Sequence, residues 1–106
     1  MHNDLLSAEY NDVVVLKLQS TEEILGRFIS LRKTNSFEPL SVKIRAPQVI
    51  IPQMLGPQEM GIQLVPWIIS DLDKDVNVDL SFVVTSFILN NDISKKYLEG
   101  TTSILI

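Results

Sequence analysis

The chain has no cysteine among its 106 residues, and its only histidine is His2. The absence of cysteine excludes disulfide bonds and thiolate metal sites, and it leaves the redox compartment undetermined. A zinc site or a histidine acid–base pair would need ligands that this composition does not contain. No nucleophile is accompanied by a recognisable base or a G-x-S-x-G turn. We therefore expect a non-enzymatic protein with no catalytic residue, no metal and no cofactor.

Long apolar runs are also missing. No apolar stretch approaches 18 residues, so the sequence predicts no membrane-spanning helix and no membrane partner. Residues 1–12 have neither a basic flank nor a long apolar segment, so they do not predict a secretory signal. A cytoplasmic location is the default expectation.

Positive charge is scarce, with 9 Lys and Arg against 13 Asp and Glu, for a net charge of −4. Phosphate contacts need clustered Lys and Arg, so this balance weighs against nucleic acid without excluding a local basic patch. A hydrophobic content of 45% is that of a globular protein. The length suits one hydrophobic core, and we predict a single domain over residues 1–106.

Apolar runs separated by polar turns predict a β-rich fold with little helix. The predicted strands are residues 13–19, 23–32, 41–51, 61–69 and 78–89, and the predicted loops are residues 33–38, 53–60 and 70–77. Pro47, Pro52 and Pro66 indicate bends or sheet edges. A short helical turn is predicted near Asn3, and a second helix follows residues 90–92 and ends at Gly100. The tail, residues 101–106, is predicted as one more short strand.

Several predicted strands are apolar on both faces, as in VVVL at 13–16 and FVVTSFIL at 82–89. An antiparallel sheet with one wet face would alternate more regularly. A second helix of about seven residues is too short to cover an apolar face of this size. We therefore expect neighbouring subunits to cover it.

Residues 13–28, VVVLKLQSTEEILGRF, resemble the first half of the Sm motif of the Sm-like (LSm) family. Leu18, Thr21, Gly26 and Phe28 stand at that motif's Leu, first Gly, second Gly and following apolar position, with the spacing intact. The family normally has glycine at the place of Thr21, where another residue is strained if the turn needs a positive φ. With LVPWI at 64–68, the run of motifs looks most like the small Sm-like proteins of marine tailed phages.

This resemblance implies an all-β fold, a small, strongly bent five-stranded antiparallel barrel with one or two short flanking helices. It implies a homo-oligomeric ring of about five to seven copies, in which the open edges of strands four and five pair between protomers. It implies a non-enzymatic module associated with single-stranded RNA, in the host cytoplasm if a phage encodes the chain. The alternative is a structural or protein-interaction ring, for phage assembly or host takeover, that binds no nucleic acid.

Within the predicted second strand, Gly26 falls on the same face as Ile24 and Phe28. Glycine inside a strand usually marks sharp bending or close backbone approach, as at the corner of a small barrel. We therefore expect Gly26 at the tightest bend of this strand, facing the interior between Ile24 and Phe28.

Arg32, Lys33 and Asn35 are the candidate RNA-binding residues, because the resemblance implies that their loop lines the ring pore. The loop lacks the family's Asp with a nearby Met-Asn or His-Asn, but Asn35 could hydrogen-bond a base edge. The family's second contact is an Arg-Gly pair between strands four and five. Here we assign that turn to SDLDKDVNV at 70–78, where aspartates would repel phosphate. Ordinary solvated loop charges are the favoured alternative for Arg32 and Lys33.

Asp71, Asp73 and Asp75 have the spacing that opens a calcium loop. Val76 and Phe82 stand where that loop needs glycine and glutamate. We interpret the three aspartates as a solvated turn and predict no metal.

Lys43 and Arg45 share one face of a predicted strand. We expect them on the wet side, paired with acids such as Glu23, rather than on a basic track. Trp67 follows Pro66, and proline beside it suggests a sheet edge. We therefore expect Trp67 to anchor a subunit interface rather than to lie in the core.

Overall fold

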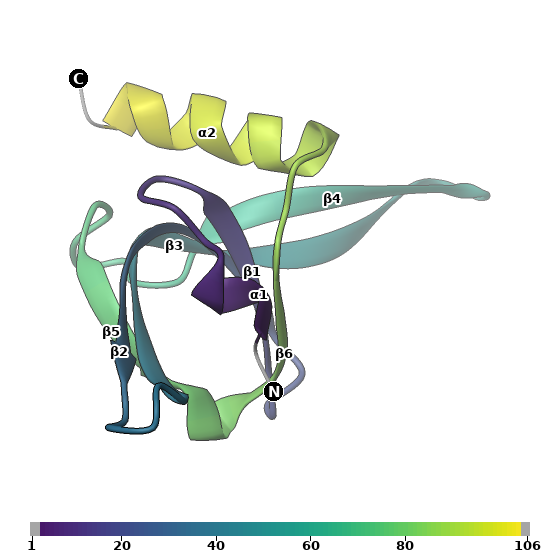
Figure 1. Cartoon of the computed structure of the whole chain (residues 1–106). Coiled ribbons are helices and arrows are strands. Elements are labelled where there is room, and N and C mark those ends of the chain that lie inside the picture. The colour runs from purple at the N-terminus through teal and green to yellow at the C-terminus, as the bar shows by residue number, and fades with distance from the viewer. Residues whose placement is uncertain (1–2, 105–106) are drawn as a thin grey trace.

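The computed structural model describes residues 3–104, and an antiparallel sheet of six strands dominates it (Figure 1). The strands are β1 (Val13–Leu18), β2 (Glu23–Lys33), β3 (Pro39–Gly56), β4 (Glu59–Pro66), β5 (Asp75–Asp79) and β6 (Val83–Ile88). A short helix, α1 (Asn3–Leu6), precedes the sheet, and a 3-10 turn, η1 (Leu80–Phe82), separates β5 from β6. The helix α2 (Asp92–Ile104) follows the last strand. The all-β class with few helices is therefore confirmed.

The strands are hydrogen-bonded in the order β4-β3-β2-β1-β6, and β5 also pairs with β3. The long strand β3 pairs with β5 through residues 41–45 and with β4 through residues 48–56. It bends between these two parts, where Ala46 has a φ of 51° and the Pro47 carbonyl accepts a hydrogen bond from the Trp67 N–H at 2.9 Å. Consequently β4 and β5 lie in succession along one edge of β3, joined by residues 67–74.

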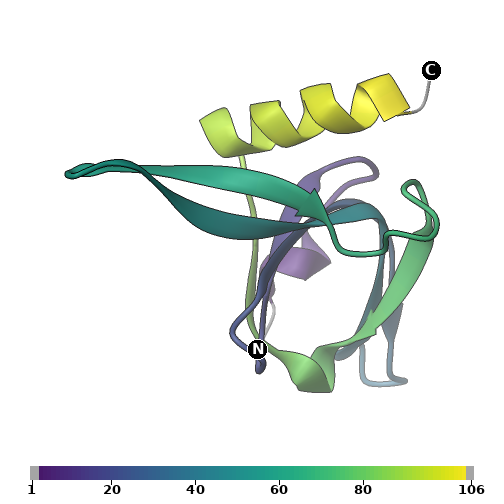
Figure 2. The same ribbon diagram turned by 180° about the vertical axis from the view of Figure 1, so that it is seen from behind.

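The sheet curls around one core without closing (Figures 1 and 2). Among the described residues, no ladder joins β6 to β4 or β5. The core inside the curl combines residues from α1, from the strands and from η1. Its members are Leu5, Val14, Leu16, Leu18, Ile24, Phe28, Val42, Ile44, Val78, Leu80 and Val83.

The opposite face of the sheet is also apolar, and α2 covers it (Figure 1). Val13, Val15 and Leu25 are buried there together with Tyr97 of α2. Our expectation that the second helix is too short to cover this face is wrong, because α2 has 13 residues. Glycine costs a helix only about 1 kcal/mol, so the helix continues past Gly100.

Two predicted boundaries at the end of the chain are therefore corrected. Gly100 lies inside α2 and does not end it, and residues 101–104 are helical instead of forming a strand. Residues 105–106 of the predicted tail strand lie outside the described residues.

The predicted loop at 53–60 is instead a hairpin with a two-residue connection at Pro57 and Gln58. Pro52 does not close β3 because this part of the strand pairs only with β4, so its missing N–H interrupts no second ladder. The hairpin extends away from the body (Figure 2). We call its outer part, residues 52–62, the arm.

The predicted strand at 78–89 is broken in the structure. Residues 80–82 form η1, and the Asp79 carboxylate caps this turn by accepting a hydrogen bond from the Ser81 N–H at 2.9 Å. A side-chain oxygen at this position satisfies a free backbone donor and favours turn over strand. By contrast, the first two predicted strands match β1 and β2 within one residue at each end.

Gly26 is buried on the face of β2 that carries the core residues Ile24 and Phe28, as predicted. A Cβ atom at Gly26 would lie only 2.7 Å from the Cβ of Ile44 on β3. The ladder between β2 and β3 is irregular at this point, between Leu25 and Arg27. Close approach of the two strands therefore explains the glycine.

The turn between β1 and β2 uses a positive φ at Thr21, which is 79°. The Thr21 N–H donates to the Leu18 carbonyl at 3.0 Å, and the Leu18 N–H donates to the Glu22 carbonyl at 2.8 Å. This is the pattern of a three-residue hairpin loop with one left-handed residue. A β-branched residue is strained there, so Thr21 stands where glycine would fit best.

Candidate nucleic-acid interface

Three neighbouring strands, β2, β3 and β5, present polar side chains in register on their outer face. Along one row, Ser30 of β2 lies opposite Lys43 of β3, which lies opposite Asn77 of β5. Along the next row, Arg32, Ser41 and Asp79 follow in the same order. These six residues line an open hollow of about 530 Å³. We call this surface the polar face.

The two cations of the polar face are not neutralised by ion pairs. In residues 3–104 the ion pairs join Lys17 to Glu23 at 3.9 Å and Arg45 to Asp75 at 2.7 Å, and neither involves Arg32 or Lys43. Asp79 brings one negative charge to the hollow, since the hydrogen bond from the Ser81 backbone lowers the pKa of its carboxyl. The polar face therefore carries two cations against one carboxylate, which suits an anion only weakly.

The predicted site residues divide between the polar face and the adjoining loop. Arg32 lines the hollow, whereas Lys33, the last residue of β2, and Asn35, in the β2–β3 loop, are exposed outside it. Sequence reasoning left Lys43 out of the site, because its register against Ser30 and Asn77 depends on the folded sheet.

The β2–β3 loop is organised by Thr34 and presents an aromatic ring. The Thr34 hydroxyl accepts hydrogen bonds from the Ser36 and Glu38 N–H groups, at 3.3 Å and 3.2 Å. The Phe37 N–H donates to the Thr34 carbonyl at 2.9 Å. Phe37 has a φ of 63° and is 75% exposed. An aromatic residue inside a polar loop is the sequence signal that would have identified it.

Arg45 lies farther along β3 and forms an ion pair with Asp75. Its Nε and Nη2 donate to the two carboxylate oxygens of Asp75 at 2.7 Å and 3.1 Å, and its Nη1 donates to the Tyr10 hydroxyl at 3.3 Å. The hydrogen bonds from Arg45 lower the pKa of the Asp75 carboxyl. The expected pairing with an acid is confirmed for Arg45, but the partner is Asp75, and Glu23 lies near Lys17 instead.

The acidic turn lies between β4 and β5, and its carboxylates are engaged in two separate contacts. Asp75 is held by Arg45, while a hydrogen bond with Asp73 raises the pKa of Asp71. In the described part of the chain, no three His, Asp or Glu side chains are grouped closely enough to hold a metal ion. The expected turn between strands four and five is at residues 70–78, and residues 67–74 join β4 to β5 in the structure. The turn directly before the last strand is η1, and it contains no Lys or Arg.

The end of the β2–β3 loop lies close to η1. Pro39 and Leu40, at the start of β3, line the same hollow as Leu80 and Ser81. Trp67 is partly buried against the core inside the curl, and its predicted place at a subunit interface stays a prediction.

The chain matches no model of a known protein family and no curated protein. No helix among residues 3–104 combines the length and hydrophobicity that a membrane span requires.

Proposed function

We propose that this chain is a non-enzymatic, ring-forming module with an Sm-like barrel fold. The observation that supports this proposal most is which strands form the two free edges of the sheet. Because β4 and β5 pair in succession with β3, they fill the place of one fourth strand interrupted at residues 67–74. β6 is then the fifth strand. The free edges are those that pair between protomers in the ring that the Sm-like resemblance implies.

Exposed apolar side chains at these edges support assembly. Val84 and Phe87 of β6 are 58% and 37% exposed, and Met54, Leu55 and Met60 of the arm are each more than 60% exposed. Open edges with apolar side chains are templates for pairing with another chain. Since α2 covers the second apolar face of the sheet, neighbouring subunits are needed for the edges rather than for that face.

Charged substitutions on β6 test this assembly. Phe87→Lys places a charge at the free edge and should lower the native mass toward that of a single chain. Phe37→Lys in the β2–β3 loop, also an exposed aromatic residue, is the matched control and should leave the native mass unchanged. A Phe87→Lys variant that keeps its native mass would argue against pairing through β6.

For the partner of the ring, we propose single-stranded RNA, bound at the polar face and the β2–β3 loop. Arg32 and Lys43 supply unpaired cations for phosphate, Asn35 is available for a base edge, and Phe37 offers a face for base stacking. The β2–β3 loop ends beside η1, so the two segments that the resemblance associates with RNA are neighbours.

A structural or protein-interaction ring is the second candidate, and the arm is the observation that favours it. The chain from residue 50 to residue 66 contains one charged residue, Glu59. A protruding, nearly uncharged hairpin is better suited to another protein than to phosphate. The negative charge of Asp79 within the polar face also favours this second candidate.

A titration with labelled oligo-U and oligo-A at about 50 mM salt separates the two candidates. RNA binding predicts that Arg32→Gln combined with Lys43→Gln weakens both complexes and flattens the salt dependence by about one to two units per engaged subunit. Removing the charges of Arg32 and Lys33 together should have a similar effect. Lys95→Gln on the exposed side of α2 is the control and should change neither the affinity nor its salt dependence. No binding of either oligomer would leave the protein-interaction ring as the better proposal.

A further inference from the structure

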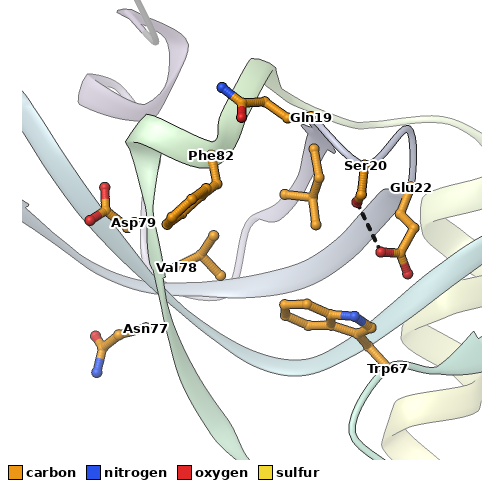
Figure 3. Close-up of a pocket in the computed structure, with 9 residues that line it drawn as sticks. Gln19, Ser20, Glu22, Trp67, Asn77, Val78, Asp79 and Phe82 are labelled. Carbon is orange, nitrogen blue, oxygen red and sulfur yellow. Dashed lines mark hydrogen bonds between the residues drawn. The ribbon is translucent and has the colours of Figure 1, made fainter.

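An apolar pocket lies between the β1–β2 turn, Trp67, the end of β5 and η1 (Figure 3). The β1–β2 turn forms one side of it, and the end of β5 and η1 form the other. Its volume is about 450 Å³, within the range of small-molecule sites in proteins. We call it the seam pocket.

The bottom of the seam pocket is part of the hydrophobic core. Leu18 and Val78 belong to the buried cluster inside the curl, and Trp67 packs against that cluster. Trp67 and Phe82 both project toward the pocket (Figure 3), and Phe82 is 60% exposed. An apolar occupant would therefore shield an aromatic ring that is otherwise in water.

The rim of the seam pocket is polar and carries only negative charge. Its members are Gln19, Ser20, Glu22, Asn77 and Asp79. The Ser20 hydroxyl donates to the Glu22 carboxylate at 3.0 Å, and the Ser81 N–H donates to Asp79 at 2.9 Å. Glu22 is thus held at the rim by a hydrogen bond within the β1–β2 turn, whereas the side chains of Asn77 and Asp79 project from β5 away from Trp67 and Phe82 (Figure 3).

No Lys or Arg lines the pocket among the described residues. Lys17, at the base of the same hairpin, donates to the Thr21 carbonyl at 2.7 Å and lies 3.9 Å from Glu23. The combination of aromatic walls and the Glu22 carboxylate therefore favours a cation over an anion.

We propose that the seam pocket binds an organic cation with an apolar body. Its ammonium or guanidinium group would lie beside Glu22, and its hydrocarbon part would pack against Trp67. A free amine and a Lys or Arg side chain of a bound peptide share this chemistry. The proposal depends on neither ring formation nor RNA binding, because every lining residue belongs to the same chain.

Trp67 is the only tryptophan of the chain, so its fluorescence reports directly on the pocket. Three probes with one phenyl ring each differ in charge: phenethylammonium, 2-phenylethanol and 3-phenylpropanoate. We expect a saturable change in Trp67 emission, with the cation bound most tightly and the carboxylate least. An N-acetylated Gly-Arg-Gly amide distinguishes the sources. Tighter binding of this peptide indicates a partner's side chain, and tighter binding of phenethylammonium indicates a free amine.

Two variants tie the response to the pocket. Glu22→Gln should lower the affinity for phenethylammonium about two- to five-fold and leave that for 2-phenylethanol unchanged. Phe82→Ala should weaken all three aromatic probes about two- to ten-fold. Glu59→Gln on the arm removes the same charge far from the pocket and should have no effect. Absence of saturable binding by any probe, or equal affinity for the cation and the carboxylate, would overturn the proposal.

Discussion

Replacing Gly26 with valine should destabilise the fold, because β3 leaves no room for a side chain at this position. An ideal Cβ atom there lies 2.7 Å from the Cβ and 2.8 Å from the Cδ1 of Ile44, closer than real Cβ contacts. Ile44 is fully buried, so it cannot turn toward solvent. Overpacking of this kind typically costs about 1–3 kcal/mol, and the lower entropy of the unfolded variant offsets less than about 1 kcal/mol of it.

Urea unfolding, followed by Trp67 fluorescence at one fixed protein concentration, measures this loss. Gly56→Ala is the control, because a Cβ atom at Gly56 meets nothing within 4 Å. Combining Gly26→Ala with Ile44→Gly should cost less than the sum of the two single changes, since Ile44→Gly removes the Cβ, Cγ1 and Cδ1 atoms that the new Cβ atom would meet. Unchanged stability of Gly26→Val, or strict additivity in the double variant, would refute the close approach of β2 and β3.

Three further perturbations follow from single contacts. Thr21→Gly should raise the unfolding midpoint, because relief of a left-handed φ is worth about 1–2 kcal/mol against a glycine entropy cost of about 0.5–1 kcal/mol; a lower midpoint would contradict this. Tyr97→Phe should cost about 1–2 kcal/mol in urea unfolding, since the single proton of the Tyr97 hydroxyl is shared between the Arg45 and Ala46 carbonyls, at 2.8 Å and 2.9 Å. The pKa of Asp75 is lowered by Arg45, so its contribution to stability is present above the unfolded pKa of about 3.9 and lost as pH falls through the folded value. The stability difference between the wild type and Asp75→Asn should therefore shrink below about pH 4 in thermal unfolding, and a difference independent of pH would argue against the pair.

The first half of the fold could be predicted from the sequence because its signals are local. The apolar runs mark β1 and β2, and the polar turn between them marks where each strand ends. The glycine at position 26 indicates which face of β2 points into the core. Later elements depend on tertiary context. Pro52 lies inside a strand because one side of β3 is free there, and α2 passes Gly100 because Tyr97 and Leu98 pack against the sheet.

The candidate sites show the same division. Arg32 was identified from its loop, but its neighbours Lys43 and Asn77 are set by strand register, which one sequence does not specify. The seam pocket needed still more, since it forms only where the folded chain brings the β1–β2 turn, Trp67 and η1 together. No local pattern marks Leu18, Trp67 and Phe82 as neighbours.

The native mass of the unmodified protein tests the proposed ring most directly. Sedimentation at micromolar concentration should give one species of about five to seven times the chain mass of 12.0 kDa. A closed ring has no free edge, so this mass should not grow as the protein concentration rises. A single 12.0 kDa species at micromolar concentration would contradict the ring.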